Sequence, residues 1–295
     1  TFTHQGKTRT GDIVEGGIVD LPAEDGEIPA SMTALLEGGD AMLERVGAAV
    51  SGGERSLTLN DVKLESPVLR PPKILAVGLN YMDHFNEIPE EARKARGLKL
   101  PRTPVIFNKQ STAANGPYDP ILLPEESREF DYEAELGVVI GRTCRRVSEE
   151  QAFDVVAGYT VLNDLTIRDW QRAAPTMTMG KSWDTHCPMG PCLVTKDELP
   201  DPGNLDVLCT VDGEARQQFN TRGMLFDIPQ QIAYLSTAFT LLPGDVIATG
   251  TSEGVALYRP GQPFLREGQV VRVEIEGIGA IENRVVADPG TSFIR

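Results

Sequence analysis

Phe130-Asp131-Tyr132-Glu133-Ala134-Glu135-Leu136 is the stretch that decides the fold and the chemistry of this chain. It leads into Leu-Gly-Val-Val-Ile at 136–140, an apolar and β-branched segment that predicts a buried strand. Glu133 and Glu135 lie two residues apart at its start, so a strand directs both carboxylates to the same face. Further along, a second strand-like run at 159–163 ends directly before Asp164.

Three carboxylates gathered at the ends of apolar strands repel one another unless a positive charge lies between them. A hard divalent cation such as Mg²⁺ or Mn²⁺, ligated by oxygen, meets that need. The alternative is that Glu133 and Glu135 are solvated on an edge strand and that Asp164 caps the helix that follows it. The carboxylates alone leave both interpretations open.

Composition limits the classes of partner. The chain has 295 residues and a formal net charge of −15, which makes nucleic acid and anionic membrane surfaces poor partners. Its apolar runs are far shorter than the roughly 20 residues of a membrane span. The first seven residues lack the apolar core of a secretion signal. We therefore expect a cytoplasmic protein that acts on a small molecule.

Residues 1–66 are expected to form a small N-terminal α+β domain. The segment 13–21 predicts a β-hairpin with a Gly-Gly turn. Ser31 is expected to begin a short helix, and Asp40 to cap a longer one that ends at 51–53. Three prolines within 64–72 predict an extended connector to the rest of the chain.

Residues 67–295 are expected to form the catalytic domain, an α+β unit with a β-rich core. Gly and Pro turns separate short predicted strands at 73–77, 104–108, 135–140, 158–163, 191–194, 206–211, 245–249 and 269–275. Predicted helices are fewer, at 83–97, 148–153, 165–172 and 227–237. This irregular order argues against a doubly wound sheet.

A histidine and a glutamate follow the first of these strands, in Gly78-Leu79-Asn80-Tyr81-Met82-Asp83-His84-Phe85-Asn86-Glu87. In a helix His84 and Glu87 are i and i+3, so the carboxylate can accept a hydrogen bond from the imidazole. Such a pair forms a general base that works near neutral pH. The alternative is a surface His–Glu pair without a chemical role.

Further polar residues follow Asp164. If 165–172 is helical, Asp164, Arg168 and Gln171 share one face, where they suit a substrate carboxylate or a metal-bound water. The alternative is an exposed helix on which Arg168 pairs with Asp169 or Glu150. Lys181, in Gly180-Lys181-Ser182, is interpreted as a positive charge near the carboxylates that holds a substrate oxygen or an enolate.

A glycine-rich segment closes the set. Residues 243–254 predict a turn, a strand and a loop in which backbone N–H groups and the Thr251 hydroxyl bind a carboxylate. Gly-rich loops after strands are common, so this signal is weak by itself.

Taken in order, these segments resemble the fumarylacetoacetate hydrolase family over roughly residues 70 to 290. The motifs that carry the resemblance are Gly78-Leu79-Asn80-Tyr81-x-x-His84-x-x-Glu87, Asp131-Tyr132-Glu133-x-Glu135-Leu136, Asn163-Asp164-x-Thr166-x-Arg168-Asp169-x-Gln171, Gly180-Lys181-Ser182-x-Asp184-Thr185 and Pro243-Gly244-Asp245-x-Ile247-x-Thr249-Gly250-Thr251. Departures at Gln110, Trp183 and Ser252 concern the substrate pocket rather than the metal.

The resemblance implies a mixed β-sandwich roll that forms a homodimer and binds Mg²⁺ or Mn²⁺ through Glu133, Glu135 and Asp164. It implies that His84 and Glu87 activate water on a lid, and that Lys181 is catalytic. The residues that it implies for substrate binding are Tyr81, Arg168, Gln171 and Thr251.

Members of this family share an enolate of a 2-oxo acid that the metal stabilises. Because the His84–Glu87 dyad is complete, the resemblance favours hydrolysis of a C–C bond in an acylpyruvate-like 2,4-dioxo acid, a reaction of aromatic catabolism. The alternatives are isomerisation, tautomerisation or decarboxylation of a related 2-oxo acid such as oxaloacetate. The part of the substrate beyond its pyruvate-like end is left open, as is the choice between Mg²⁺ and Mn²⁺.

Overall fold

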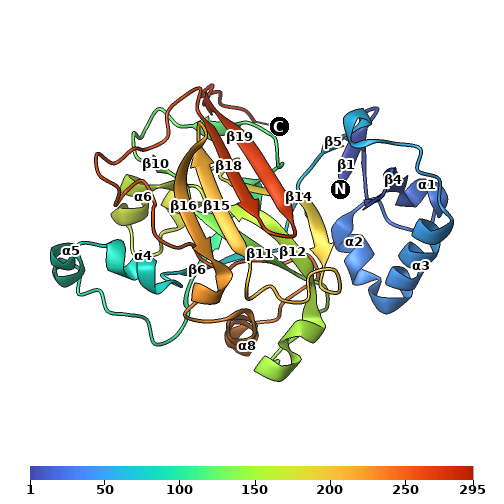
Figure 1. Cartoon of the computed structure of the whole chain (residues 1–295), viewed down its shortest axis with the longest axis horizontal. Coiled ribbons are helices and arrows are strands. Elements are labelled where there is room, and N and C mark those ends of the chain that lie inside the picture. The colour runs from blue at the N-terminus through green and yellow to red at the C-terminus, as the bar shows by residue number, and fades with distance from the viewer. Residues whose placement is uncertain (295) are drawn as a thin grey trace.

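The computed structural model describes residues 1–294, so the last residue of the predicted catalytic domain, Arg295, lies outside the described residues. Two large mixed sheets pack face to face, and a small N-terminal unit lies to one side of them (Figure 1). This architecture is the α+β class with a β-rich core that the sequence predicts. In the described residues no helix is long and apolar enough to cross a membrane.

The first sheet has seven strands, in the order β7-β6-β17-β11-β12-β14-β8. They are β6 (Ile74–Gly78), β7 (Val105–Lys109), β8 (Ala114–Asn115), β11 (Ala134–Ile140), β12 (Val156–Asn163), β14 (Cys187–Thr195) and β17 (Val246–Ala248). Both faces of its central strands are buried, which explains their continuous apolar sequence. Along β6, for example, Leu75 and Val77 join one apolar cluster while Ile74 and Ala76 join the other.

The second sheet has five strands, in the order β16-β15-β18-β19-β9, and packs on one face of the first. They are β9 (Ile121–Leu123), β15 (Asp206–Val211), β16 (Glu214–Asn220), β18 (Val270–Ile275) and β19 (Gly279–Ala287). Val207, Cys209 and Val211 alternate inward along β15, as a half-buried strand requires. Helix α8 (Ile228–Ala238), which Asp227 caps, buries Ile232 and Leu235 in the same core.

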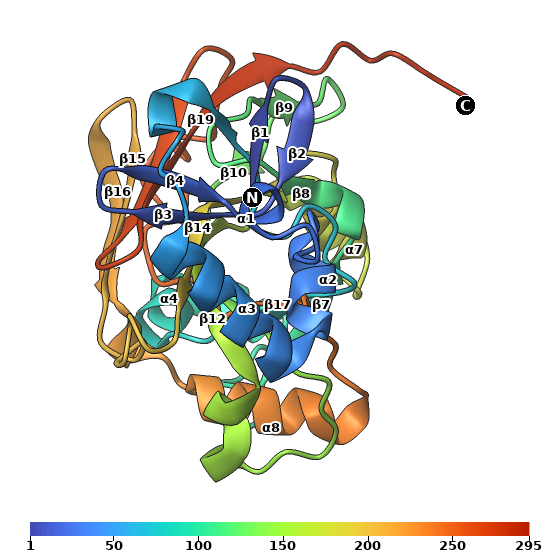
Figure 2. The same ribbon diagram turned by 90° about the vertical axis from the view of Figure 1, so that its right-hand side faces the viewer.

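The N-terminal unit covers the other face of the seven-stranded sheet. Its elements are β1 (Phe2–His4), β2 (Lys7–Arg9), β3 (Gly11–Val14), β4 (Gly17–Asp20), α1 (Leu21–Glu24), α2 (Met32–Glu37), α3 (Gly39–Gly52) and β5 (Lys63–Leu64). Figure 2 shows α2 and α3 in front of strands of the main sheet. Leu35 and Leu36 of α2 join the cluster that contains Ile74 and Ala76. The unit therefore shares a core with the main sheet, and the boundary at 66/67 stays a prediction.

The predicted hairpin and the helix after Ser31 are confirmed as β3–β4 and α2. The predicted cap at Asp40 is wrong: α3 starts at Gly39 with Gly38 before it, and Asp40 lies in the first turn. Gly39 has φ +61°, a conformation that glycine adopts without strain, and this lets the chain turn directly from α2 into α3.

Two helix predictions in the main unit need correction. The predicted helix 83–97 is divided into α4 (Met82–Glu87) and α5 (Glu90–Ala95), because Pro89 forces extended backbone on Ile88. The segment at 148–153 is a 3₁₀ helix, Glu149–Val155. Short 3₁₀ helices also occur at Leu59–Asp61, Ser111–Ala113 and Thr221–Gly223. In the two large sheets, the strands β8, β9, β16 and β19 were not predicted.

The third correction concerns the segment after Asp164. Residues Thr166–Ile167 form a strand, β13, which pairs with β10 (Phe130–Asp131), so helix α6 spans only Arg168–Ala173. Asp164 therefore does not share a helical face with Arg168 and Gln171. The β10–β13 pair instead brings the quoted stretch at 130–136 against the start of α6. Helix α7 (Thr178–Lys181) packs close to α6.

Candidate active site

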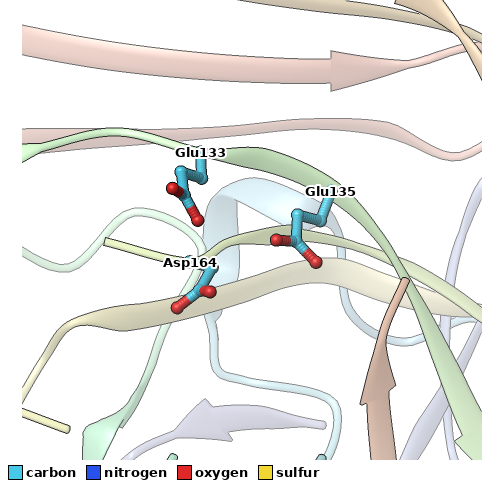
Figure 3. Close-up of side chains that lie close together, drawn as sticks. All are labelled: Glu133, Glu135 and Asp164. Carbon is cyan, nitrogen blue, oxygen red and sulfur yellow. The ribbon is translucent and has the colours of Figure 1, made fainter. Parts of the chain in front are cut away.

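Strand register brings the three predicted metal ligands together. In the antiparallel pair β11–β12, Ala134 lies opposite Asn163, so Glu133 and Glu135 flank the end of the strand that Asp164 follows. The backbone N–H of Asp164 donates to the carbonyl of Glu133 at 2.8 Å. The three side chains converge, and one ligand oxygen from each lies within 4.8 Å of the others (Figure 3).

All three carboxylates are buried, which argues against solvation on an edge strand. Glu133 is 5%, Glu135 2% and Asp164 0% exposed. Burial, together with the charges of Asp164 and Glu133, raises the pKa of Glu135 well above its ordinary value. Three carboxyl groups that are buried together, one of them with a raised pKa, are a donor set suited to a divalent cation bound by oxygen. We conclude that Glu133, Glu135 and Asp164 form a site able to hold such an ion.

Basic side chains from two helices, α6 and α7, reach the same carboxylates. Lys181 Nζ lies 2.5 Å from Glu133 Oε2 and 2.6 Å from Asp164 Oδ2, where the sequence predicted a positive charge. Arg168 Nη2 lies 2.6 Å from Glu133 Oε1. Burial alone would raise the pKa of Glu133, but these two cations outweigh it and lower that pKa well below the ordinary value.

Arg168 is not on an exposed face, and it pairs with neither Asp169 nor Glu150. Its Nε donates to Asp131 Oδ2 at 2.8 Å, and its Nη1 donates to Gln171 Oε1 at 3.1 Å. The guanidinium thus joins Asp131 to Glu133 and holds the Gln171 amide. A role of Arg168 and Gln171 in substrate binding stays a prediction.

The His84–Glu87 pair forms as predicted and is not a surface pair. His84 Nδ1 lies 2.6 Å from Glu87 Oε1, and His84 is 8% exposed. The backbone N–H of Gly254 donates to Glu87 Oε2 at 2.8 Å, which fixes the carboxylate. Because a carboxylate only accepts, the ring donates through Nδ1 and its Nε2 is left to accept a proton. The loop whose Gly250 N–H binds Glu135 also binds Glu87 through the N–H of Gly254, which places the His84–Glu87 pair beside the carboxylates.

The backbone N–H groups of the Gly-rich loop bind carboxylates, as the sequence predicts, and the role of Thr251 in binding a substrate carboxylate stays a prediction. The N–H of Gly250 donates to Glu135 Oε2 at 2.7 Å, and that of Gly254 to Glu87, so both bind carboxylates of the protein itself. Thr251 is buried, and its hydroxyl accepts a hydrogen bond from Gln217 Nε2 at 2.8 Å. The hydroxyl proton of Thr251 is therefore available for another acceptor.

Tyr81 lies directly before α4, where it packs edge-on against Phe219 with ring centroids 5.1 Å apart. Burial, and then the charge of Glu135, raise the pKa of its hydroxyl, so Tyr81 is a neutral hydrogen-bonding group near the carboxylates. Its predicted role in substrate binding is not decided by this placement.

Sequence reasoning missed three polar residues around the site: Lys109, Asp131 and Gln217. Asp131 accepts from the backbone N–H groups of Ala256 and Leu257, at 2.7 and 3.0 Å, in addition to its pair with Arg168. Gln217 Oε1 accepts from the N–H of Ala134 at 2.9 Å, so it joins β11 to the Thr251 loop. For Lys109 and Asp131 the available signal was a charged side chain next to apolar strand residues, whereas Gln217 lies in a mostly polar strand that gives no such signal.

Comparison with known proteins identifies the family. A family profile described as "Fumarylacetoacetate (FAA) hydrolase C-terminal" matches residues 73–286. The oxaloacetate tautomerase fahd2 of Xenopus laevis, named as mitochondrial, is 43% identical over 273 residues, which cover 92% of this chain and 83% of that protein.

The solved structures agree. Maleylpyruvate hydrolase from Sphingobium sp. SYK-6 superposes with a TM-score of 0.79 and 34% identity, covering 97% of this chain and 98% of that one. A second structure of that hydrolase, in complex with manganese(II) and pyruvate, has a TM-score of 0.78, 35% identity and 97% coverage of each chain. The mixed β-roll with a small N-terminal region is thus the fold of this family, as the sequence predicted, and the chain is a member of the fumarylacetoacetate hydrolase family.

Proposed function

We propose that the protein is a divalent-metal-dependent tautomerase that interconverts the enol and keto forms of oxaloacetate or a closely related 2-oxo dicarboxylate. The observation that carries this proposal is the buried His84–Glu87 pair beside a three-carboxylate site, a base next to a metal site. The substrate class is supported by the 43% identity to an oxaloacetate tautomerase over most of both chains. The expected C–C hydrolase activity becomes the second candidate.

The resident ion would be held by Glu133, Glu135 and Asp164, and both Mg²⁺ and Mn²⁺ suit their oxygen donors. The manganese-bound hydrolase structure favours Mn²⁺ as the first ion to test. When bound, the ion supplies Lewis-acid stabilisation of the negative charge that develops on the 2-oxo group.

His84 is the proposed proton carrier. In the keto-to-enol direction its Nε2 takes a proton from C3 of the substrate, the C3–H electron pair forms the C2–C3 double bond, and the 2-oxo oxygen gains the charge. Transfer of that proton from the His84 imidazolium to the oxygen gives the enol and restores neutral His84, and the reverse sequence gives the ketone. Glu87 holds the ring in the required tautomer and stabilises the imidazolium.

Lys181 and Thr251 are the proposed substrate-binding groups. Burial would lower the pKa of Lys181, but the charges of Asp164 and Glu133 outweigh it and raise that pKa, so the amine stays protonated and serves as a cation rather than a base. We propose that it stabilises the enolate oxygen. The hydroxyl proton of Thr251, which Gln217 leaves available, suits a substrate carboxylate.

C–C bond hydrolysis of an acylpyruvate-like substrate is the second candidate. It is favoured by the 34% identity to maleylpyruvate hydrolase across nearly the whole chain. The same His84 base would then remove a proton from water instead of from carbon. Decarboxylation of oxaloacetate shares the enolate, and it differs in that the C3–CO₂ bond breaks instead of C3–H.

NMR separates these reactions. With oxaloacetate in deuterated water, tautomerisation predicts Mn²⁺- or Mg²⁺-dependent acceleration of enol–keto exchange, inhibited by EDTA, without loss of substrate. With acetylpyruvate, hydrolysis predicts pyruvate and acetate. Metal-dependent cleavage of acetylpyruvate without any effect on oxaloacetate exchange would refute the tautomerase and establish the second candidate.

Two further expectations stay predictions. A homodimer is tested by light scattering or sedimentation of the purified protein, and a cytoplasmic location by fractionation of the source cells. The Xenopus relative is named as mitochondrial, which makes the organelle the competing location.

A further inference from the structure

Each of the three metal-site carboxylates has one oxygen bound to a fixed donor of the scaffold. Glu135 Oε2 accepts from the backbone N–H of Gly250, and Glu133 Oε1 pairs with Arg168. Asp164 Oδ1 lies 2.6 Å from Nζ of Lys109. Lys181 approaches different atoms, Glu133 Oε2 and Asp164 Oδ2. The scaffold donors therefore determine which oxygen each carboxylate turns inward.

Lys109 differs from the other two donors because it also contacts the backbone of Lys181. Its ammonium donates to the carbonyl of Leu165 at 3.2 Å and to the carbonyl of Lys181, the last residue of α7. Its side chain is 0% exposed, so no water replaces these partners. One ammonium thus donates to the backbone carbonyls of Leu165 and Lys181 and forms an ion pair with the Asp164 carboxylate.

We propose that Lys109 is a positioning residue that orients both the metal ligand Asp164 and the catalytic cation Lys181. Lys109 lies at the end of β7, a strand that pairs with β6 along its whole length, so the backbone that carries the Lys109 side chain is held in place. Asp164 and Lys181 both lie where a strand or a short helix ends and depend on external contacts. The inference goes beyond the proposed function, since it depends on the metal site and not on which 2-oxo acid is bound.

The direction in which the Mn²⁺ dissociation constant changes when Lys109 is removed separates a positioning role from an effect of charge alone. Lys109 adds positive charge near the carboxylates, so an effect of charge alone predicts that its removal tightens binding of a divalent cation. A positioning role predicts weaker Mn²⁺ binding instead, because the variant lacks the contact that fixes Oδ1 of Asp164. One oxygen of this buried carboxylate is then left without its cationic partner. Mn²⁺ is the probe, and EPR of the free ion gives its dissociation constant without any reference to activity.

The test compares Lys109→Met with Lys73→Met. Lys73 also pairs with a buried aspartate, Asp245, at 2.6 Å, but the two residues lie directly before β6 and β17 rather than at the site. We expect Lys109→Met to weaken Mn²⁺ binding about 10- to 100-fold, whereas Lys73→Met changes thermal stability and leaves Mn²⁺ binding unaltered. Unchanged or tighter binding in folded Lys109→Met would overturn the proposal.

Two further variants extend the test to catalysis and to failure of folding. At saturating Mn²⁺, Lys109→Met should lower kcat for the active substrate. It should cause no further loss of kcat in a Lys181→Met background, because the ammonium that Lys109 orients is then absent.

If Lys109→Met does not fold, Lys109→Arg is the second variant. It keeps the charge but not the geometry of the three contacts, so a positioning role predicts weakened Mn²⁺ binding. Wild-type binding by Lys109→Arg would then refute it. If no substrate is turned over, the proposed function fails while the Mn²⁺ comparison still decides this inference.

Discussion

Replacing Arg168 with methionine is expected to destabilise the protein strongly, because Arg168 separates two buried carboxylates. Its guanidinium is 4% exposed and pairs with Asp131 at 2.8 Å and with Glu133 at 2.6 Å, side chains that are 0% and 6% exposed. Removing one partner of a buried pair leaves an uncompensated charge and costs about 3–5 kcal/mol. Such a loss lowers the melting temperature by on the order of 10 °C.

Arg172→Met is the matched control on the same helix. Arg172 pairs with Glu129 at 2.6 Å, but their side chains are 35% and 31% exposed, so the loss is about 0–1 kcal/mol. Urea unfolding of wild type and both variants, each with and without Mn²⁺, measures the difference. A stability of Arg168→Met equal to that of Arg172→Met would refute the reasoning. If the two variants had equal stability and the KM of Arg168→Met rose sharply, Arg168 would act mainly as the substrate ligand that the resemblance implies.

Three other outcomes are expected. Glu87→Gln should lower kcat about 10²-fold with little change in KM, since it weakens the base but leaves the binding groups; unchanged kcat in steady-state assays would exclude the dyad as base. Because the pKa of Glu135 is higher in the folded than in the unfolded protein, its protonated form stabilises the fold below pH 4.5, the ordinary pKa. This contribution is lost as the pH rises through the pKa of the folded state. Urea unfolding of the wild type in EDTA should therefore show a free energy of unfolding that declines with rising pH, and Glu135→Gln should reduce this decline. An equal decline in the wild type and the variant would count against the role of Glu135. Gly250→Ala should weaken both Mn²⁺ binding and stability, because the backbone has φ +103° and a Cβ would lie 2.9 Å from the carbonyl oxygen of Val77. Gly261→Ala, with φ +75° and open space, should cost only strain, so equal effects in calorimetry would contradict the steric argument.

The metal site could be predicted from the sequence because its geometry is local to two strands. Glu133 and Glu135 follow from the period of a strand, and Asp164 from the end of its neighbour. The His84–Glu87 pair is equally local, since it needs only one helical turn. The predictions of the carboxylate cluster and of the His84–Glu87 pair do not depend on the exact bounds of the surrounding elements. The wrongly predicted helix start at 165 therefore did not affect them.

The missed residues depend on contacts distant in sequence. Lys109 reaches Lys181 across 72 positions, and Gln217 reaches Ala134 across 83. No periodicity indicates such a pairing, because each results from the stacking and order of the strands. Which carboxylates the N–H groups of Gly250 and Gly254 bind could not be predicted for the same reason, because Glu135 and Glu87 are distant from the loop in sequence.

The central claim is that a buried His–Glu pair next to a three-carboxylate metal site moves a proton on a 2-oxo dicarboxylate. The most direct measurement is the rate of oxaloacetate enol–keto exchange, followed by NMR, for wild type with Mn²⁺, wild type with EDTA, and His84→Ala with Mn²⁺. We expect rapid exchange in the first sample alone, with the variant still binding Mn²⁺. Equally fast exchange by His84→Ala, or no acceleration by metal-loaded wild type, would contradict the account.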